Sequence, residues 1–120
     1  MTKHIRHGFG AVRPYLYGDQ SSIDLVLALG GELVENAHGH MEIKLGDSML
    51  VVEFKPDWSA DQRRQSVYVY VPDVDAAYTA SLRAGAVSVD APKDQRYQER
   101  SCRVRDGFGN TWHVSTFTGS

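Results

Sequence analysis

The chain has 120 residues, of which 42% are hydrophobic and 23% are charged, so it provides one globular domain and is neither disordered nor fibrous. Its 13 basic and 15 acidic side chains give a net charge of −2, which argues against a nucleic-acid partner, and its single cysteine, Cys102, excludes an internal disulfide. No apolar run exceeds five residues, far fewer than the ~20 that span a bilayer, so we expect no membrane partner and a cytoplasmic location.

The first half of the chain predicts one helix among short strands. Residues 12–17 are the first strand candidate, and Pro14 indicates a strand start or an edge position. A helix is expected after Asp19, an N-cap residue, and Gly30-Gly31 should end it, because glycine accepts the left-handed turn that follows a helix. Strands are then expected at residues 33–36, at 40–45, where apolar and polar residues alternate, and at 49–54 after a turn at residues 46–48.

The second half predicts the same order of elements after a polar loop at residues 55–65. Residues 66–71 alternate valine and tyrosine and are the strongest strand candidate. A helix should begin at Asp73, with Asp75 in its first turn, and Gly85 should close it. Residues 87–89, 99–105 and 111–117 complete the strands, and residues 91–98 are expected to form a polar connection.

The two halves form a weak internal repeat of about 55 residues. Neither half has enough strands to hide an apolar sheet face alone, so the halves should pack together. We therefore predict an α+β fold, in which two paired βαβββ modules form a cupped mixed sheet with the helices on its outer face. The single domain would cover residues 1–120, with half-modules at about 10–54 and 66–118.

The order of elements resembles that of the vicinal oxygen chelate superfamily, which includes glyoxalase I, bleomycin-resistance proteins and extradiol dioxygenases. Residues 105–112 (RDGFGNTW) resemble the superfamily's turn before its last strand, with Gly107 in place of the usual proline. Residues 69–78 (VYVPDVDAAY) are similar to its strand-to-helix junction, and residues 14–16 resemble its first strand. The resemblance implies the fold, but the superfamily hosts many chemistries, so it leaves the function open.

The resemblance also implies four metal-ligand positions, one on each of four strands. Carried over one by one, they fall near Val12, at Glu53 on one alignment of the fourth strand (Leu50 or Val52 on others), on Ser66 and on His113. Valine cannot bind a metal and a neutral hydroxyl is a poor ligand, so at most His113 and Glu53 remain. Because a protein-held divalent metal normally takes three or four ligands, we expect no metal cofactor.

Strand alternation predicts which side chains line the cleft, given the helices on the outer face. The expected ligand-binding residues on the cleft face are aromatic with a few polar groups, a chemistry suited to a planar or amphipathic small molecule: Ser66, Tyr68, Tyr70, His113, Ser115 and Phe117. For the tyrosines, ordinary strand composition is the alternative. Trp58 would close the site as a lid or would simply anchor its loop. Arg100 would bind an anionic group or would belong to a solvated basic strand face.

These observations favour a metal-free binding protein similar to the bleomycin-resistance group. It would sequester an aromatic or amphipathic small molecule, an antibiotic or a metabolite, in a cleft at a homodimer interface. The alternative is a metal-dependent glyoxalase- or dioxygenase-type lyase or transferase that uses His113 and Glu53. A third hypothesis is a plain dimeric domain whose partner is another protein. The residues favour a binding protein over an enzyme and leave catalytic residues unassigned.

Overall fold

The computed structural model describes residues 6–57 and 65–119. After a short turn at Arg6–Gly8 (η1), the first module runs β1 (Tyr15–Gly18), α1 (Gln20–Ala28), β2 (Glu32–Ala37), β3 (His40–Leu45) and β4 (Ser48–Phe54). The second runs β5 (Ser66–Tyr70), α2 (Val74–Arg83), β6 (Val87–Asp94), β7 (Glu99–Arg105) and β8 (Thr111–Phe117). The predicted α+β fold with paired βαβββ modules is confirmed.

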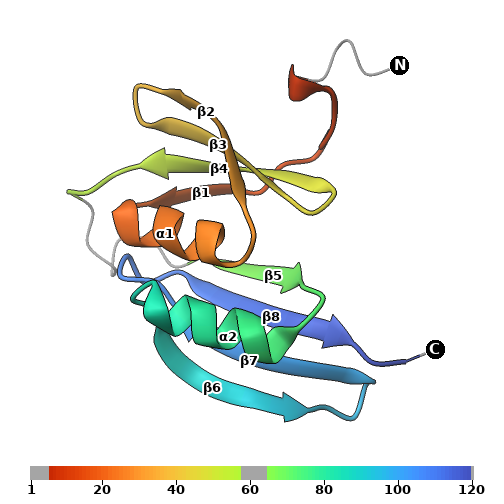
Figure 1. The fold of residues 1–120 in the computed structure, drawn as a ribbon. Coiled ribbons are helices and arrows are strands. Elements are labelled where there is room, and N and C mark those ends of the chain that lie inside the picture. The colour runs from red at the N-terminus through yellow and green to blue at the C-terminus, as the bar shows by residue number, and fades with distance from the viewer. Residues whose placement is uncertain (1–5, 58–64, 120) are drawn as a thin grey trace.

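Each module builds its own four-stranded mixed sheet, so the cupped sheet has two parts. The strand orders are β1-β4-β3-β2 and β5-β8-β7-β6, and in each sheet the first pair is parallel while the others are antiparallel. The identical orders establish the internal repeat at the level of topology. The two sheets are stacked one above the other in Figure 1, with α1 in front of the upper sheet and α2 in front of the lower one.

The helices begin and end where the sequence indicated. The Asp19 carboxylate accepts the Ser21 backbone N–H, and the Asp73 carboxylate accepts the Ala76 backbone N–H, so both helices have side-chain N-caps. Gly30 and Gly85 both adopt a φ of +103°, in the left-handed region that glycine enters without steric cost. The same residue types therefore delimit both helices.

Two strand predictions were wrong at one end by more than a single residue. The first strand begins at Tyr15 rather than residue 12, because Val12 is largely exposed and the ladder to β4 begins with the Pro14 carbonyl, which accepts the Val51 N–H. Strand β6 continues to Asp94 through residues expected to form a connection. It is an edge strand with two register shifts against β7, and such a strand tolerates polar residues and a proline.

One hydrophobic core joins the two modules between the sheets and the helices. Trp112 and Val114 of β8, Ile43 of β3 and the valines of β5 contribute to it, as strand alternation predicted. The modules are also joined by polar contacts: the Gln65 side chain exchanges hydrogen bonds with the Tyr17 backbone of β1. No helix in residues 6–57 and 65–119 is long and apolar enough to cross a membrane.

Candidate functional site

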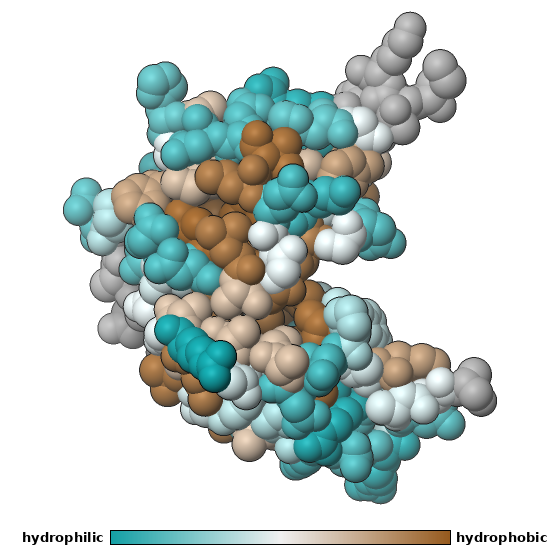
Figure 2. All heavy atoms as spheres, in the orientation of Figure 1, coloured by the Kyte–Doolittle hydropathy of each residue, from teal (hydrophilic) through white to brown (hydrophobic). Residues whose placement is uncertain are grey.

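A hollow separates the two modules on the side away from the helices α1 and α2. Figure 2 shows it as a notch at the right with hydrophobic side chains at its floor. One cavity of about 200 Å³ lies there, between the β3–β4 turn and residues 67–70 of β5. A shallower one of about 450 Å³ lies between Pro14–Leu16 beside β1 and Gln65–Tyr68 beside β5. Both cavities are lined by Pro14, Val67 and Tyr68, so they adjoin, and together they are called the cleft below.

Two tyrosines of β5 extend into this cleft. Tyr68 and Tyr70 are 49% and 61% exposed, whereas the intervening Val69 is buried in the core. Their ring centroids are 5.4 Å apart, and Tyr68 also stacks on the His113 ring of β8 at 5.8 Å with an interplanar angle of 10°. Three rings from neighbouring strands therefore form one aromatic surface.

A buried carboxylate fixes the tyrosine hydroxyl groups. Glu99, at the start of β7, accepts a hydrogen bond from Tyr68 and another from Tyr70, the latter at 2.5 Å. Ser115 donates to the Tyr68 hydroxyl at 2.9 Å. These tyrosine bonds hold the pKa of the Glu99 carboxyl below its usual value, and the bond to Glu99 raises the pKa of Tyr70 to about 12. Both phenols are therefore protonated, and Glu99 is ionised, at neutral pH.

A small polar cavity of about 80 Å³ adjoins the aromatic surface on the same sheet. Tyr97, Arg103 and Asp90 line it together with Tyr68 and His113. Arg103 forms an ion pair with Asp90 across the β6–β7 ladder. The positive charge nearest to His113 on β7 is thus already neutralised within the sheet.

The structure brings most of the predicted binding residues to one face. Ser66 lies on the same face of β5 as the two tyrosines, and Phe117 is exposed at the end of β8, opposite Glu99 in the ladder. Arg100 does not join them: it lies on the helix side of β7, where it donates to Asp75 of α2 at 2.9 and 3.1 Å. Trp58 lies outside the described residues.

The two metal ligands of the alternative hypothesis belong to different sheets. His113, in β8, stacks on Tyr68. Glu53, in β4, accepts a hydrogen bond from Tyr15 at 2.7 Å and lies 2.9 Å from the His40 ring nitrogen. The Tyr15 and His40 bonds hold the pKa of the Glu53 carboxyl below its usual value. Within residues 6–57 and 65–119, neither residue belongs to a group of three metal-ligating side chains.

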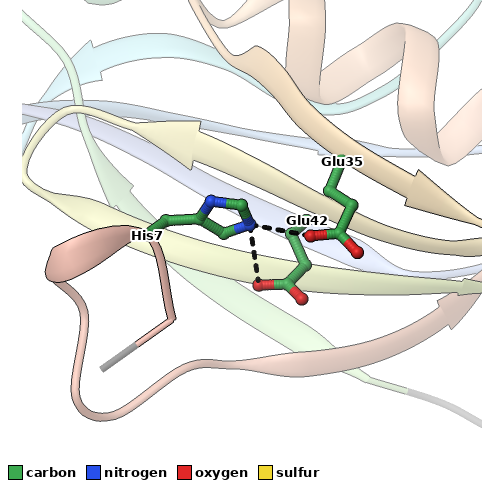
Figure 3. Close-up of side chains that lie close together, drawn as sticks. All are labelled: His7, Glu35 and Glu42. Atoms are coloured by element: carbon green, nitrogen blue, oxygen red, sulfur yellow. Dashed lines mark hydrogen bonds and ion pairs between the residues drawn. The ribbon is translucent and has the colours of Figure 1, made fainter. Parts of the chain in front are cut away.

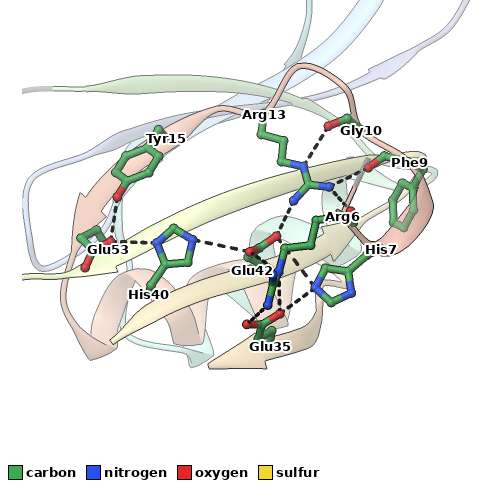
Figure 4. Close-up of polar contacts among 10 residues, drawn as sticks. All are labelled: Arg6, His7, Phe9, Gly10, Arg13, Tyr15, Glu35, His40, Glu42 and Glu53. Carbon is green, nitrogen blue, oxygen red and sulfur yellow. Dashed lines mark hydrogen bonds and ion pairs between the residues drawn. The ribbon is translucent and has the colours of Figure 1, made fainter. Parts of the chain in front are cut away.

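One such group does occur elsewhere, on the first sheet. Figure 3 shows His7 pointing toward Glu35 of β2 and Glu42 of β3, with His7 Nε2 lying 3.0 and 3.9 Å from their carboxylates. Figure 4 shows that two guanidinium groups already bind the same carboxylates, Arg6 on Glu35 and Arg13 on Glu42. A metal ion would have to displace them, so the geometry is that of an ion-paired attachment of the N-terminal segment.

Strand alternation alone could have identified Glu99 as a cleft residue. Cys102 and Val104 are apolar members of β7 with helix-side positions, so Glu99, three residues before Cys102, falls on the opposite face. No sequence signal pairs it with the β5 tyrosines, which lie about thirty positions earlier and reach Glu99 across β8.

Comparison with known proteins shows relatives of this fold only at the level of structure. No family profile and no curated protein matches the sequence. A bleomycin resistance determinant encoded on transposon Tn5 superposes with a TM-score of 0.68 at 20% identity, covering 88% of this chain and 95% of its own. A bleomycin-binding protein complexed with bleomycin gives 0.66 at 19% identity, with 88% and 96% covered.

A third neighbour carries the broader family name. It is a glyoxalase/bleomycin resistance protein/dioxygenase family enzyme from Burkholderia phytofirmans PsJN, with a TM-score of 0.70, 14% identity, and 88% and 96% of the two chains covered. At these identities the likeness establishes the fold. The predicted resemblance to the vicinal oxygen chelate superfamily is therefore confirmed for the fold.

Proposed function

We propose that this chain is a metal-free binding protein that sequesters an aromatic or amphipathic small molecule, such as an antibiotic or a metabolite, in the cleft between its two sheets. The observation that carries the proposal is the pair Tyr68 and Tyr70, exposed in the cleft yet fixed by Glu99. A ligand that stacks on such rings gains contact area without first ordering them. The bleomycin-binding neighbour supports the same class of function.

The absence of a metal is part of this proposal and follows from the chemistry of the implied ligand positions. Val12 has no ligating atom and Ser66 offers a neutral hydroxyl. His113 and Glu53 have partners of their own in separate sheets. The competing proposal, a metal-dependent lyase, transferase or dioxygenase, would require these two residues to bind one ion. Metal analysis of protein purified without chelator separates the two, because stoichiometric metal would refute the metal-free proposal.

We also propose that the cleft is completed by a second copy of the chain. The cavity beside the β3–β4 turn, of about 200 Å³, is smaller than the roughly 300–1,000 Å³ of typical small-molecule sites, and the larger cavity that adjoins it is shallow. A partner subunit would enlarge and close it. A sedimentation experiment at micromolar concentration should show a homodimer, and a monomer would contradict this part of the proposal. A cytoplasmic location fits the single cysteine, Cys102, a buried free thiol.

Ligand binding is tested by thermal stability against a panel of aromatic antibiotics and metabolites, with divalent metals as a second arm. A ligand at 100 times its dissociation constant should add about 2.7 kcal/mol of stability. Tyr70→Ala should then weaken binding about five- to thirtyfold through lost stacking. Val87→Ala, at an exposed position on the distant edge strand β6, is the matched control and should bind normally. Equal affinity of both variants would show that the tyrosines stabilise the sheet and do not bind the ligand.

A further inference from the structure

The hydrogen bonds around Glu99 leave the two tyrosine hydroxyl groups of the cleft as acceptors rather than donors. The Tyr70 proton is directed to Glu99, and so is the Tyr68 proton, while Ser115 donates its proton to Tyr68. A phenol oxygen that donates one bond still has lone pairs with which it can accept. A ligand that meets these hydroxyl groups therefore finds oxygen atoms that can accept its N–H or O–H groups.

The carboxylate behind them carries a charge for which the described part of the chain provides no ion-pair partner. Among the ion pairs of residues 6–57 and 65–119, none involves Glu99. The two arginines of β7 that lie closest to Glu99 in the sequence form ion pairs with other carboxylates: Arg100 with Asp75 on the helix side and Arg103 with Asp90. Glu99 is 7% exposed, so its charge is screened less than that of a surface carboxylate.

The first sheet provides an internal contrast. Strands β3 and β7 occupy corresponding positions in the two sheets, and each carries one buried glutamate on the face away from the core, Glu42 and Glu99. Glu42 is bound by the guanidinium of Arg13, which the N-terminal segment places over the sheet, as Figure 4 shows. In the second sheet the Glu99 carboxylate is instead bound by the hydroxyl groups of Tyr68 and Tyr70, and no ion pair within the described residues involves it.

Those aromatic side chains complete the surroundings that a cation prefers. The rings of Tyr68 and Tyr70 lie 5.4 Å apart beside the carboxylate to which their hydroxyl groups donate, and Phe117 lies opposite Glu99 in the β7–β8 ladder. Tyr97, also exposed, lines the adjoining polar cavity with Tyr68. Aromatic ring faces attract cations, and quaternary ammonium groups are commonly bound by several rings at once.

We infer that the ligand of this cleft carries a cationic ammonium group, which lies against the ring faces and phenol oxygens of Tyr68 and Tyr70 with the carboxylate of Glu99 behind them. The inference rests on the proposed function and narrows it to one class of ligand. It makes Glu99 a specificity-determining residue. An anionic aromatic molecule of the same size should be excluded, because it would meet an unneutralised negative charge.

The test compares two probes of the same shape. Benzyltrimethylammonium is a cation, and neopentylbenzene is its neutral isostere, in which carbon replaces nitrogen. Titrations followed by nuclear magnetic resonance of the protein should show at least tenfold tighter binding of the cation to the wild-type protein, with shifts at Tyr68 and Tyr70. Glu99→Gln keeps a hydrogen-bond acceptor for one tyrosine but removes the negative charge. This variant should therefore bind the cation and the neutral isostere equally tightly. Glu35→Gln, an ion-paired carboxylate on the other sheet, should leave the preference unchanged.

The outcomes distinguish the cationic-ligand inference from the proposed binding function on which it rests. Equal binding of both probes at the tyrosines would overturn the cationic inference while leaving an aromatic binding protein intact. Tighter binding of the cation that survives Glu99→Gln would also overturn it. If neither probe binds the wild-type protein, the inference fails, and the aromatic panel described above decides the proposed function separately. The wild-type comparison does not depend on how well the Glu99 variant folds.

Discussion

Asn110 should be one of the most sensitive positions for the stability of the whole chain. Its side chain is fully buried in the turn before β8 and contacts both modules. Its Nδ2 donates to the Tyr17 carbonyl of β1 and to Asp106, both at 3.1 Å, and its Oδ1 accepts from Gln65 at 2.8 Å. Asn110→Ala removes three hydrogen bonds at once and leaves a small void where the amide was.

The magnitude follows from these three bonds. At about 0.5–1.5 kcal/mol of net stability per hydrogen bond, the loss of three bonds should lower the free energy of unfolding by about 1.5–4.5 kcal/mol. The Tyr17 carbonyl keeps its bond from Gln65, and Asp106 keeps four others, so the cost should stay within this range. That is a large fraction of the 5–15 kcal/mol that stabilises a typical domain.

The assay is urea denaturation followed by tryptophan fluorescence and circular dichroism, with the free energy of unfolding obtained by linear extrapolation. Asn36→Ala is the matched control, because Asn36 makes one hydrogen bond, to the Gly39 N–H, in the exposed β2–β3 turn. The control should lose less than about 1 kcal/mol. If Asn110→Ala loses no more than the control does, the turn does not join the modules and the reasoning is refuted.

Three further predictions concern other parts of the chain. Gly31→Ala should destabilise the protein by about 1–3 kcal/mol in the same denaturation assay, because an added Cβ would lie 2.7 Å from the Val26 carbonyl oxygen; an unchanged midpoint would contradict this. Burial raises the pKa of the Cys102 thiol to about 11, so a thiol reagent at pH 8 should modify the folded protein far more slowly than the denatured protein. Tyrosinate absorbance should show Tyr15 and Tyr70 ionising near pH 12 instead of 10. Because the pKa of each is raised in the folded protein, the stability that they contribute is complete below pH 10 and is lost as the pH rises through 12. Titration of every tyrosine near pH 10 would count against the hydrogen bonds from both tyrosines to their carboxylates.

The candidate site shows where sequence reasoning succeeds and where it stops. Alternation along β5 and β8 predicted that Tyr68, Tyr70, His113 and Ser115 share a face, and the structure brings them together because the pleat is fixed within each strand. Arg100 lies on the opposite face of β7, and its partner Asp75, on α2, is 25 residues away in the sequence. The charge partners of a surface arginine depend on which helix packs against its strand, and no local pattern carries that information.

The sequence by itself determined the local structure of this protein. The capping residues Asp19 and Asp73 and the glycines at 30 and 85 delimit both helices. Alternation predicted the bounds of β3, and the flanking polar segment and turn predicted those of β7 and β8, because these signals act within a few neighbouring residues. Only the tertiary structure decided how the site is assembled. Glu99 meets the β5 tyrosines across β8 because strand order and register place residues about thirty positions apart within hydrogen-bond distance. The charge and polarity of the cleft, which indicate its ligand, arise from that pairing.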